Sequence, residues 1–369
     1  MKIRNNYLII AVIAFALLFA KLNAATIEKN IEFNNGKLKF GGTLALPDTI
    51  NHHPTIILVT GSGQQNRDEE IFGFKPFKQI SDYLVERGYA VFRYDDRGVG
   101  ESKNTKSDLD SATVFNFADD AYSALKALKN DSQINKNIDK NKIGILGHSE
   151  GGFIAQYLAA KYPEDINFIV LMAAPIVGGR AISNYQVEIA NREAGLSEAG
   201  IDTIMKYQNL LVDAVQRGDS QESLKELLIA TTLAAYHVMP EDKKKFITNP
   251  ELYAQSAANM QIKQLTSPYI RAWFASDAQQ YLPKIKCPVL AIFGEKDQQV
   301  PVSLNLAPLQ KAFVGRENQI EIKIIKDANH LFQAAKTGSF SEYSKLEKKF
   351  ADDFLASIQK FLDNKIMKK

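Results

Sequence analysis

The sequence contains only one cysteine, Cys287, in 369 residues, so the chain cannot form an internal disulfide bond. A chain of this length can bury a large core, and 45% of its residues are hydrophobic, which suits a fold without cross-links. Cys287 begins an apolar run, where a lone cysteine is typically a small buried hydrophobe. Internal repeats and low-complexity stretches are also lacking, which argues against solenoid and disordered proteins.

The sequence also has little net charge, and its first residues account for the small excess of +3 at pH 7. Lys2 and Arg4 precede an apolar run over residues 7–20, and small residues follow at positions 24 and 25. A positive segment, a short apolar run and a small-residue cleavage site together predict a secretory signal peptide over residues 1–24. We therefore expect an exported protein, either periplasmic or extracellular.

An uncleaved membrane anchor is the alternative to a signal peptide. The apolar run is shorter than the roughly 20 residues of a membrane-spanning helix, and no cysteine lies near the cleavage site to carry a lipid. Removing residues 1–24 deletes three basic residues and no acidic one, which leaves 42 of each sign. The mature chain is then formally neutral, so we expect neither nucleic-acid binding nor a stable membrane span.

The most specific pattern in the chain is G-x-S-x-G at residues 147–151. An apolar run precedes it and a stretch with helical periodicity follows, which predicts a strand, a sharp turn and a helix. Ser149 at such a turn would be the nucleophile of an elbow. Gly147 and Gly151 fit this interpretation, because a Cβ at either position would collide with the neighbouring strand or helix. An ordinary Gly/Ser loop is the alternative. The rest of the chain has to show whether the residues that a nucleophilic serine needs are also present.

A serine hydroxyl is a weak nucleophile at neutral pH and needs a general base that a third group orients. In proteins with this elbow, the chain order is serine, acid, histidine. Of five histidines, only His330 is late in the sequence, on a loop after the strand-like run 320–325. His330 is therefore the predicted base. The other four lie in a polar loop, inside the elbow or in a long helical region: His52, His53, His148 and His237.

The acid should lie at the end of the strand before the histidine. Residues 287–293 form a near-continuous apolar run, as expected for a parallel strand that is buried on both faces. Asp297 follows this run and is the best candidate, with Glu295 and Asp327 as its rivals. Its role would be to hold the imidazole in one tautomer and to stabilise the imidazolium. A structural aspartate in a turn or at a helix cap is the alternative.

Acyl transfer also needs N–H donors for the negative charge that develops on the carbonyl oxygen. One donor is the main chain of the residue after the nucleophile, Glu150. The other comes from a loop after an early strand, and here the strand-like residues 55–60 precede a Gly-rich loop. In that loop the N–H of Ser62 is the first choice and that of Gly63 the second. No Gly-Lys-Ser/Thr follows, which argues against a phosphate loop.

Strand and helix signals alternate through most of the chain, which predicts an α/β fold with a mostly parallel, doubly wound sheet. A turn sequence at residues 34–36 predicts a β-hairpin over 31–47. In such sheets the site lies outside the carboxyl ends of the strands, where Ser149, Asp297 and His330 would meet. Further strands are expected at 55–60, 89–94, 142–146, 167–173, 287–293 and 320–325, with helices at 77–87 and 112–129.

The alternation stops between residues 176 and 286, where the sequence has mainly helical periodicity. We therefore expect one core in two parts, residues 25–175 and 287–369, with the helical insertion between them. Such an insertion would be a cap that excludes water and shapes the substrate pocket. A second packing layer without a gating role is the alternative.

With these motifs in place, the chain resembles serine hydrolases of the α/β-hydrolase superfamily from about Ile31 to its C-terminus. The resemblance is to bacterial carboxylesterases with a helical cap, which are grouped with serine aminopeptidase-like and acyl-CoA thioesterase-like hydrolases. The chain departs from the family at Thr60, where the family usually has histidine. This difference changes the side-chain support of the Gly-rich loop at residues 61–64, which we call the oxyanion loop. Five segments carry the resemblance: residues 60–63, 94–102, 147–151, 294–297 and 329–330.

The residues and the resemblance together predict a carboxylic ester hydrolase that forms an acyl-enzyme on Ser149, acts on a small ester or acyl substrate and uses no metal or organic cofactor. A serine nucleophile argues against dehalogenase and epoxide hydrolase chemistry, in which a carboxylate forms the ester. An aminopeptidase or amidase could use the same residues. A thioesterase fits an export signal less well because acyl-CoA is cytosolic, and a non-catalytic binding module fits a complete triad least.

Overall fold

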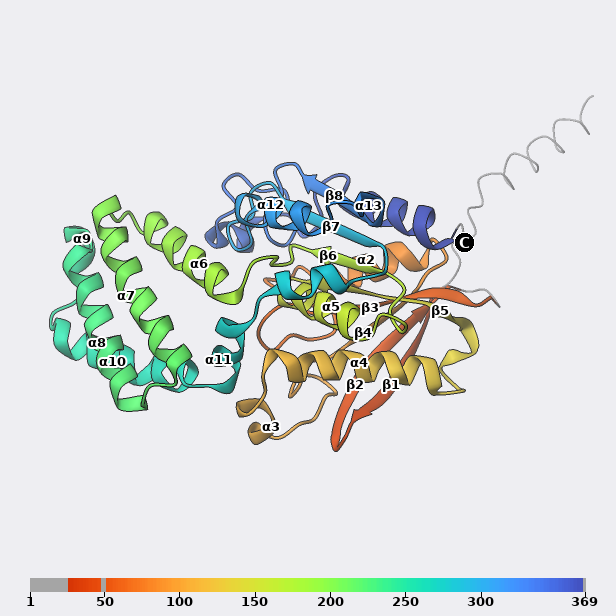
Figure 1. The fold of residues 1–369 in the computed structure, drawn as a ribbon, viewed down its shortest axis with the longest axis horizontal. Coiled ribbons are helices and arrows are strands. Elements are labelled where there is room, and N and C mark those ends of the chain that lie inside the picture. Colours follow the sequence, from red (N-terminus) through yellow and green to blue (C-terminus); the bar gives the residue numbers. More distant parts are fainter. Residues whose placement is uncertain (1–25, 48–50, 368–369) are drawn as a thin grey trace, which may run out of the picture.

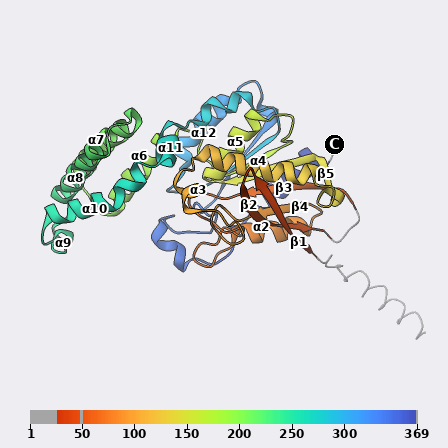
Figure 2. The same cartoon turned by 90° about the horizontal axis from the view of Figure 1, so that it is seen from below.

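The computed structural model describes residues 26–47 and 51–367, so the predicted signal peptide over residues 1–24 lies outside the described residues. Within these ranges, no helix has both the length and the apolar character needed to cross a membrane. The described strands form one eight-stranded sheet with helices on both of its faces (Figures 1 and 2). This is the predicted doubly wound α/β architecture.

The sheet has the strand order β1-β2-β4-β3-β5-β6-β7-β8. The first two pairings, β1 with β2 and β2 with β4, are antiparallel, and the other pairings are parallel. The parallel strands therefore end at one common edge, where their loops meet. The strands are β1 Ile27–Asn35, β2 Leu38–Leu46, β3 His53–Val59, β4 Ala90–Tyr94, β5 Ile138–His148, β6 Ile169–Met172, β7 Val289–Gly294 and β8 Ile320–Ile325.

The helices of the core pack on the sheet in two layers because successive strand residues point to opposite faces. Ile57 and Val59 of β3 contribute to the core on the face that α4 and α5 cover, whereas Ile56 and Leu58 contribute to the other face with α2 and α13. Figure 2 shows α4 and α5 on one side of the sheet and α2 on the other. The core helices are α2 Pro76–Val85, α3 Lys106–Asp110, α4 Val114–Asn130, α5 Glu150–Lys161, α12 Val302–Ala312 and α13 Phe354–Leu362.

Six α-helices lie between β6 and β7, in the part of the chain where the sequence predicts a cap. Both views show them extending away from the core, with α6 and α11 as the connections (Figures 1 and 2). Four of them, α7, α8, α10 and α11, share a small apolar cluster of their own, which includes Val212, Leu224 and Ile262. The cap helices are α6 Gly179–Glu193, α7 Glu198–Arg217, α8 Gln221–Val238, α9 Glu241–Lys244, α10 Pro250–Leu265 and α11 Pro268–Ala275.

The observed elements differ from the expected ones mainly at their ends. The expected helix 112–129 begins at Val114, because the side chain of Thr113 accepts a hydrogen bond from the N–H of Asn116 and caps the helix. The short α3 just before it was not expected. Gly36 of the predicted hairpin turn has φ +58°, in the region that glycine adopts without strain.

The single cysteine is buried, as expected. Cys287 lies just before β7 and is 8% exposed. Burial raises the pKa of its thiol to about 12, so at neutral pH the side chain is protonated and packs as a small apolar group.

Candidate active site

Ser149 lies between β5 and α5 with a strained backbone, φ 51° and ψ −117°. The strain follows from how closely the first turn of α5 approaches the sheet. A Cβ on Gly147 would lie 2.0 Å from the carbonyl oxygen of Gly151, and a Cβ on Gly151 would lie 2.1 Å from that of Val59. Only glycine fits at these two positions, and the tight turn between them projects the serine side chain at the edge of the sheet.

Asp297 and His330 come together at the same edge, on the loops after β7 and β8. His330 Nδ1 lies 2.8 Å from Asp297 Oδ2, and both side chains are buried. The other oxygen of Asp297 accepts the N–H groups of Gln299 at 2.7 Å and Val300 at 2.9 Å, which fix the carboxylate in place. Since Nδ1 of His330 faces the carboxylate, Nε2 is the nitrogen left for proton transfer.

The two rival acids lie elsewhere. Asp327 forms an ion pair with Lys296 at 2.7 Å and is about half exposed. Glu295 accepts the main-chain N–H of Asp327 at 2.9 Å. Neither carboxylate bonds to His330, so Asp297 is the acid whose geometry fits the predicted role.

His330 lies beside His148, the residue that precedes the serine. The rings of His148 and His330 have centroids 4.7 Å apart, and His148 Nε2 lies 3.1 Å from the main-chain oxygen of His330. Within the described part of the chain the Ser149 hydroxyl forms no hydrogen bond, and in enzymes without substrate such contacts often shorten only on binding. The structure thus brings all three predicted side chains to one edge of the sheet.

The predicted oxyanion loop lies directly beside the nucleophile. A Cβ on Gly61 would be 3.4 Å from Ser149 Cβ. Among the described residues, the main-chain N–H groups of Ser62, Gly63 and Glu150 have no acceptor. These are the three predicted donors, and all three are free to bind an anion.

Two acidic side chains support this loop in place of the histidine that the family usually has. The hydroxyl of Thr60 donates to Asp96 at 2.9 Å, and Asp96 also accepts the N–H of Gln65 at 2.9 Å. Glu69 accepts the N–H of Gly61 at 2.7 Å. Burial raises the pKa of Asp96 well above its ordinary value, and the nearby Glu69 and Glu150 carboxyls contribute to the increase.

Glu150 has a second feature besides its N–H group. Its side chain is 4% exposed, and burial raises the pKa of the carboxyl from 4.5 to about 7, against the effect of a hydrogen bond from Tyr269. Tyr269 lies on α11, and its hydroxyl donates to Glu150 Oε2. This bond joins the cap to the residue that follows the nucleophile.

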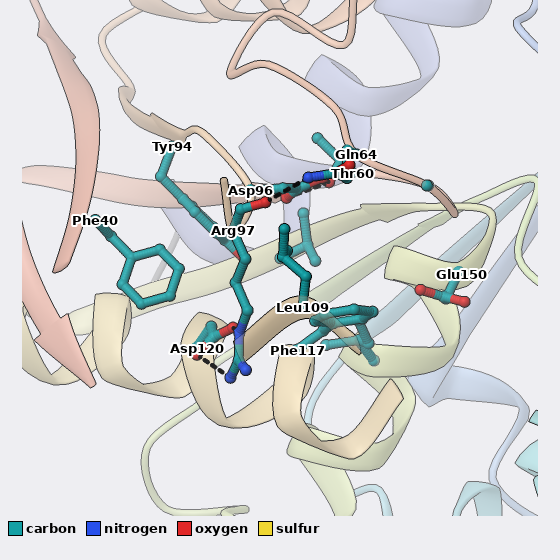
Figure 3. Close-up of a pocket in the computed structure, with 14 residues that line it drawn as sticks. Phe40, Thr60, Gln64, Tyr94, Asp96, Arg97, Leu109, Phe117, Asp120 and Glu150 are labelled. Atoms are coloured by element: carbon teal, nitrogen blue, oxygen red, sulfur yellow. Dashed lines mark hydrogen bonds and ion pairs between the residues drawn. The ribbon is translucent and has the colours of Figure 1, made fainter. Parts of the chain in front are cut away.

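A pocket opens next to this bond and contains about 450 Å³ of empty space including its mouth. Figure 3 shows Glu150 on one side of it and the ion pair of Arg97 with Asp120 on the other. Arg97 Nε lies 2.5 Å from Asp120 Oδ2, so this arginine braces the loop after β4. Apolar side chains form most of the remaining wall: Phe40, Val59, Tyr94, Leu109, Phe117 and Ile154.

The described residues contain no group of three or more His, Cys, Asp or Glu side chains that could hold a metal ion. The polar groups at the site are those of the elbow, the Asp297–His330 pair and the oxyanion loop. Their arrangement suits the attack of a hydroxyl on a carbonyl carbon, with a base and N–H donors in reach.

Sequence patterns did not reveal the roles of Glu69, Tyr269 and the His148 side chain. His148 bonds to Glu69 across 79 positions of the sequence, and Tyr269 bonds to Glu150 across 119 positions. No local motif indicates contacts over such separations. The position of His148 inside the elbow was the one sequence feature that could have pointed to a role for its side chain.

The raised pKa of Glu150 predicts a pH-dependent stability. Native Glu150 stays protonated until about pH 7, whereas its unfolded counterpart ionises near 4.5, so its contribution to stability is lost as the pH rises through this window. Glu150→Gln removes the titration and keeps an acceptor for Tyr269. Between pH 5 and pH 8, the free energy of unfolding of Glu150→Gln should rise by about 2 kcal/mol relative to the parent.

Urea unfolding of both proteins at the two pH values measures this difference. Glu164→Gln, a change at an 87% exposed side chain, is the control, and its difference from the parent should not depend on pH. A pH-independent difference for Glu150→Gln would contradict the protonated native carboxyl.

Comparisons with known proteins agree with this fold. A family model described as serine aminopeptidase, S33, matches residues 74–334. The curated esterase EstD of Thermotoga maritima is 27% identical over 305 residues, which cover 82% of this chain but only 60% of EstD, so the chain spans less than two thirds of that relative. A 2-hydroxy-6-oxononadienedioate/2-hydroxy-6-oxononatrienedioate hydrolase of Pseudomonas is 24% identical. The aligned region covers 78% of this chain and 86% of the length of that hydrolase.

Solved structures show the same fold. An esterase of Pyrococcus furiosus superposes with a TM-score of 0.53 at 15% identity, covering 94% of this chain and 95% of its own. A proline iminopeptidase of Mycobacterium smegmatis gives 0.51 at 17% identity, with 92% and 99% coverage. The family match covers most of the chain, and the chain therefore belongs to the serine aminopeptidase S33 family of α/β-hydrolases, which are serine hydrolases.

Proposed function

We propose that the protein is an exported carboxylesterase that cleaves carboxylic esters through an acyl-enzyme on Ser149. The observation that carries the proposal is the buried hydrogen bond between His330 and Asp297 at the carboxyl edge of the sheet, beside the strained elbow. Three free N–H groups next to the serine support it. The similarity to EstD, whose name is esterase, points to the same bond type.

In this mechanism, His330 Nε2 takes the proton of the Ser149 hydroxyl as the oxygen attacks the ester carbonyl. Asp297 keeps Nδ1 protonated and stabilises the imidazolium that forms. The N–H groups of Glu150 and Ser62, or of Gly63 in place of Ser62, hold the negative carbonyl oxygen. His330 then gives its proton to the leaving alcohol and later activates the water that releases the acid.

The small pocket supports a short or compact apolar acyl or alcohol group. Aromatic and branched side chains form most of its wall, and Glu150 and Ile154 of α5 also line it. The cap would close over this pocket, since Tyr269 of α11 already reaches the elbow. We propose that the cap excludes water and helps select the substrate.

An aminopeptidase is the second candidate, because two acidic side chains favour it. Glu150 and Asp96 both line the pocket next to the nucleophile, and a protonated amine of a substrate would offset their unfavourable proximity. The family name, serine aminopeptidase, points the same way. Esters and aminoacyl amides therefore have to be compared directly.

Ser149→Ala should lower turnover by roughly 10³–10⁶-fold, because no other hydroxyl is placed at the elbow. The measurement is a panel of chromogenic esters of varied acyl length, beside aminoacyl and peptidyl amides. Ser344→Ala, at an exposed side chain, is the control and should keep parental rates. Near-normal turnover by pure Ser149→Ala would refute the assignment, and faster amide than ester cleavage would select the aminopeptidase.

Asp297→Asn should lower kcat by about 10³–10⁴-fold, because an amide cannot keep His330 in the required tautomer. The rival Asp327 gives a matched control, since Asp327→Asn removes only an exposed ion pair and should change kcat by less than about threefold. Steady-state kinetics on the best ester of the panel measures both variants. A larger loss in Asp327→Asn than in Asp297→Asn would assign the acid differently.

Export rests on the first residues of the sequence. We propose that residues 1–24 are removed on secretion, which leaves Ala25 as the first residue. Intact-mass measurement of the protein recovered outside the cytoplasm of a secreting host tests this. A mass that retains residues 1–24 would instead support the anchor.

A further inference from the structure

A second carboxylate–imidazole pair, Glu69 and His148, lies beneath the proposed catalytic residues. Both side chains are buried, with exposed fractions of 1% and 2%. His148 Nδ1 lies 2.8 Å from Glu69 Oε1, and His148 Nε2 lies 3.1 Å from the main-chain oxygen of His330. Each of the two ring nitrogens of His148 therefore faces an oxygen atom.

The partners of these nitrogens decide how many protons the ring carries. A main-chain carbonyl oxygen only accepts, so His148 Nε2 has to donate to His330. Glu69 Oε1 also accepts the N–H of Gly61 at 2.7 Å, which favours the ionised carboxylate, and an ionised carboxylate only accepts, so that His148 Nδ1 donates to it. A neutral imidazole has one N–H and an imidazolium has two, so with an ionised Glu69 the ring makes both contacts as an imidazolium.

We infer that His148 is held as an imidazolium by the Glu69 carboxylate, and that this ion pair positions the oxyanion loop relative to His330. The inference rests on the proposed function for its kinetic consequence, although the charge state of the pair does not depend on it. Glu69 and His148 touch no reacting atom and are positioning residues.

The surrounding charges agree with this assignment. Burial on its own lowers the pKa of His148, but the Glu69 carboxylate, the His330 carbonyl and Asp297 raise the net pKa above its ordinary value. Asp96 interacts with Glu69 from the loop after β4, and Tyr343 faces Asp297 from the segment after β8. The other groups around His148 are therefore acidic, apart from the ring of His330.

The pair connects the loop after β3, the end of β5 and the loop after β8 in one chain of hydrogen bonds. The chain runs from the Gly61 N–H through Glu69 and His148 to the His330 carbonyl. It thereby sets the distance between the N–H donors after β3 and the imidazole after β8, a distance to which acyl transfer is sensitive. The rings of His148 and His330 lie side by side, with centroids 4.7 Å apart, so a shift of one moves the other.

Nitrogen-15 NMR of the histidine-labelled, otherwise unchanged enzyme tests the charge state. We expect both ring nitrogens of His148 to be protonated from pH 6 to pH 8. His148→Asn assigns the signals by their loss. If that variant does not fold, separate substitutions of His52, His53 and His237 and the shift of His330 after an organophosphate reacts with Ser149 assign them by elimination. An unprotonated His148 nitrogen at pH 7 would place the proton on Glu69 and overturn the inference.

Kinetics test the positioning role. His148→Asn should lower kcat by about 10–100-fold while KM changes less than about threefold, because the variant moves the loop after β3 relative to His330 and leaves the apolar wall from Phe40, Tyr94 and Phe117 in place. A kcat within about threefold of the parent, or a rise in KM as large as the fall in kcat, would overturn the proposal.

His237→Asn, at an exposed position on the cap helix α8, is the matched control and should leave both kcat and KM unchanged. The outcome is separable from that of the proposed function. If Ser149→Ala kept full activity, the proposed chemistry would fail, and the NMR signals of His148 would still report the protonation of the pair.

Discussion

The contact between the first turn of α5 and strands β3 and β5 is the constraint on which the rest of the site depends. Carbonyl oxygens lie where a Cβ on Gly147 or Gly151 would have to be, so the chain can pass from strand to helix only through a tight turn. That turn forces Ser149 to φ 51°. It leaves the N–H groups at the start of α5 without intrahelical acceptors, as at every helix N-terminus, and the same packing thus provides both the nucleophile and one of its anion-binding donors.

Buried carboxylates hold the loops around this turn. Asp297 fixes the ring of His330, Asp96 holds the Thr60 and Gln65 ends of the oxyanion loop, and Glu69 joins that loop to His148. Burying a carboxylate is unfavourable unless hydrogen bonds or a cation compensate it. The protein meets this cost with short main-chain and imidazole contacts. The result is a site whose donors are oriented before a substrate arrives, as electrostatic catalysis requires.

The parts of the fold and the site that could be predicted from the sequence are those that local sequence patterns determine. The strand–turn–helix order around Ser149 and the apolar runs before Asp297 and His330 indicate elements whose ends must meet at one edge of a parallel sheet. The fold and the proximity of these three residues therefore follow from pattern and topology. The expected bounds of β8, residues 320–325, agree with the observed strand, whereas α3 has no apolar periodicity and was missed.

The contacts that the sequence could not predict are those of polar side chains between distant segments. Glu69 stands in a loop of mixed polar residues, where its backbone has a positive φ of 52°, and its side chain reaches His148 from a distant part of the chain. Tyr269 meets Glu150 because α11 returns from the cap to the core. Both contacts depend on the three-dimensional course of the chain, and no spacing along the sequence encodes it.

The burial of Cys287 has a practical consequence for following the cap. A thiol with a pKa near 12 has almost no thiolate at neutral pH, so alkylating reagents find no reactive sulfur in the native chain. A cysteine introduced on an exposed face of α8 or α10 would be the only site that such reagents label. A fluorophore or spin label attached there would report the distance between the cap and the sheet without interference from the protein's own sulfur.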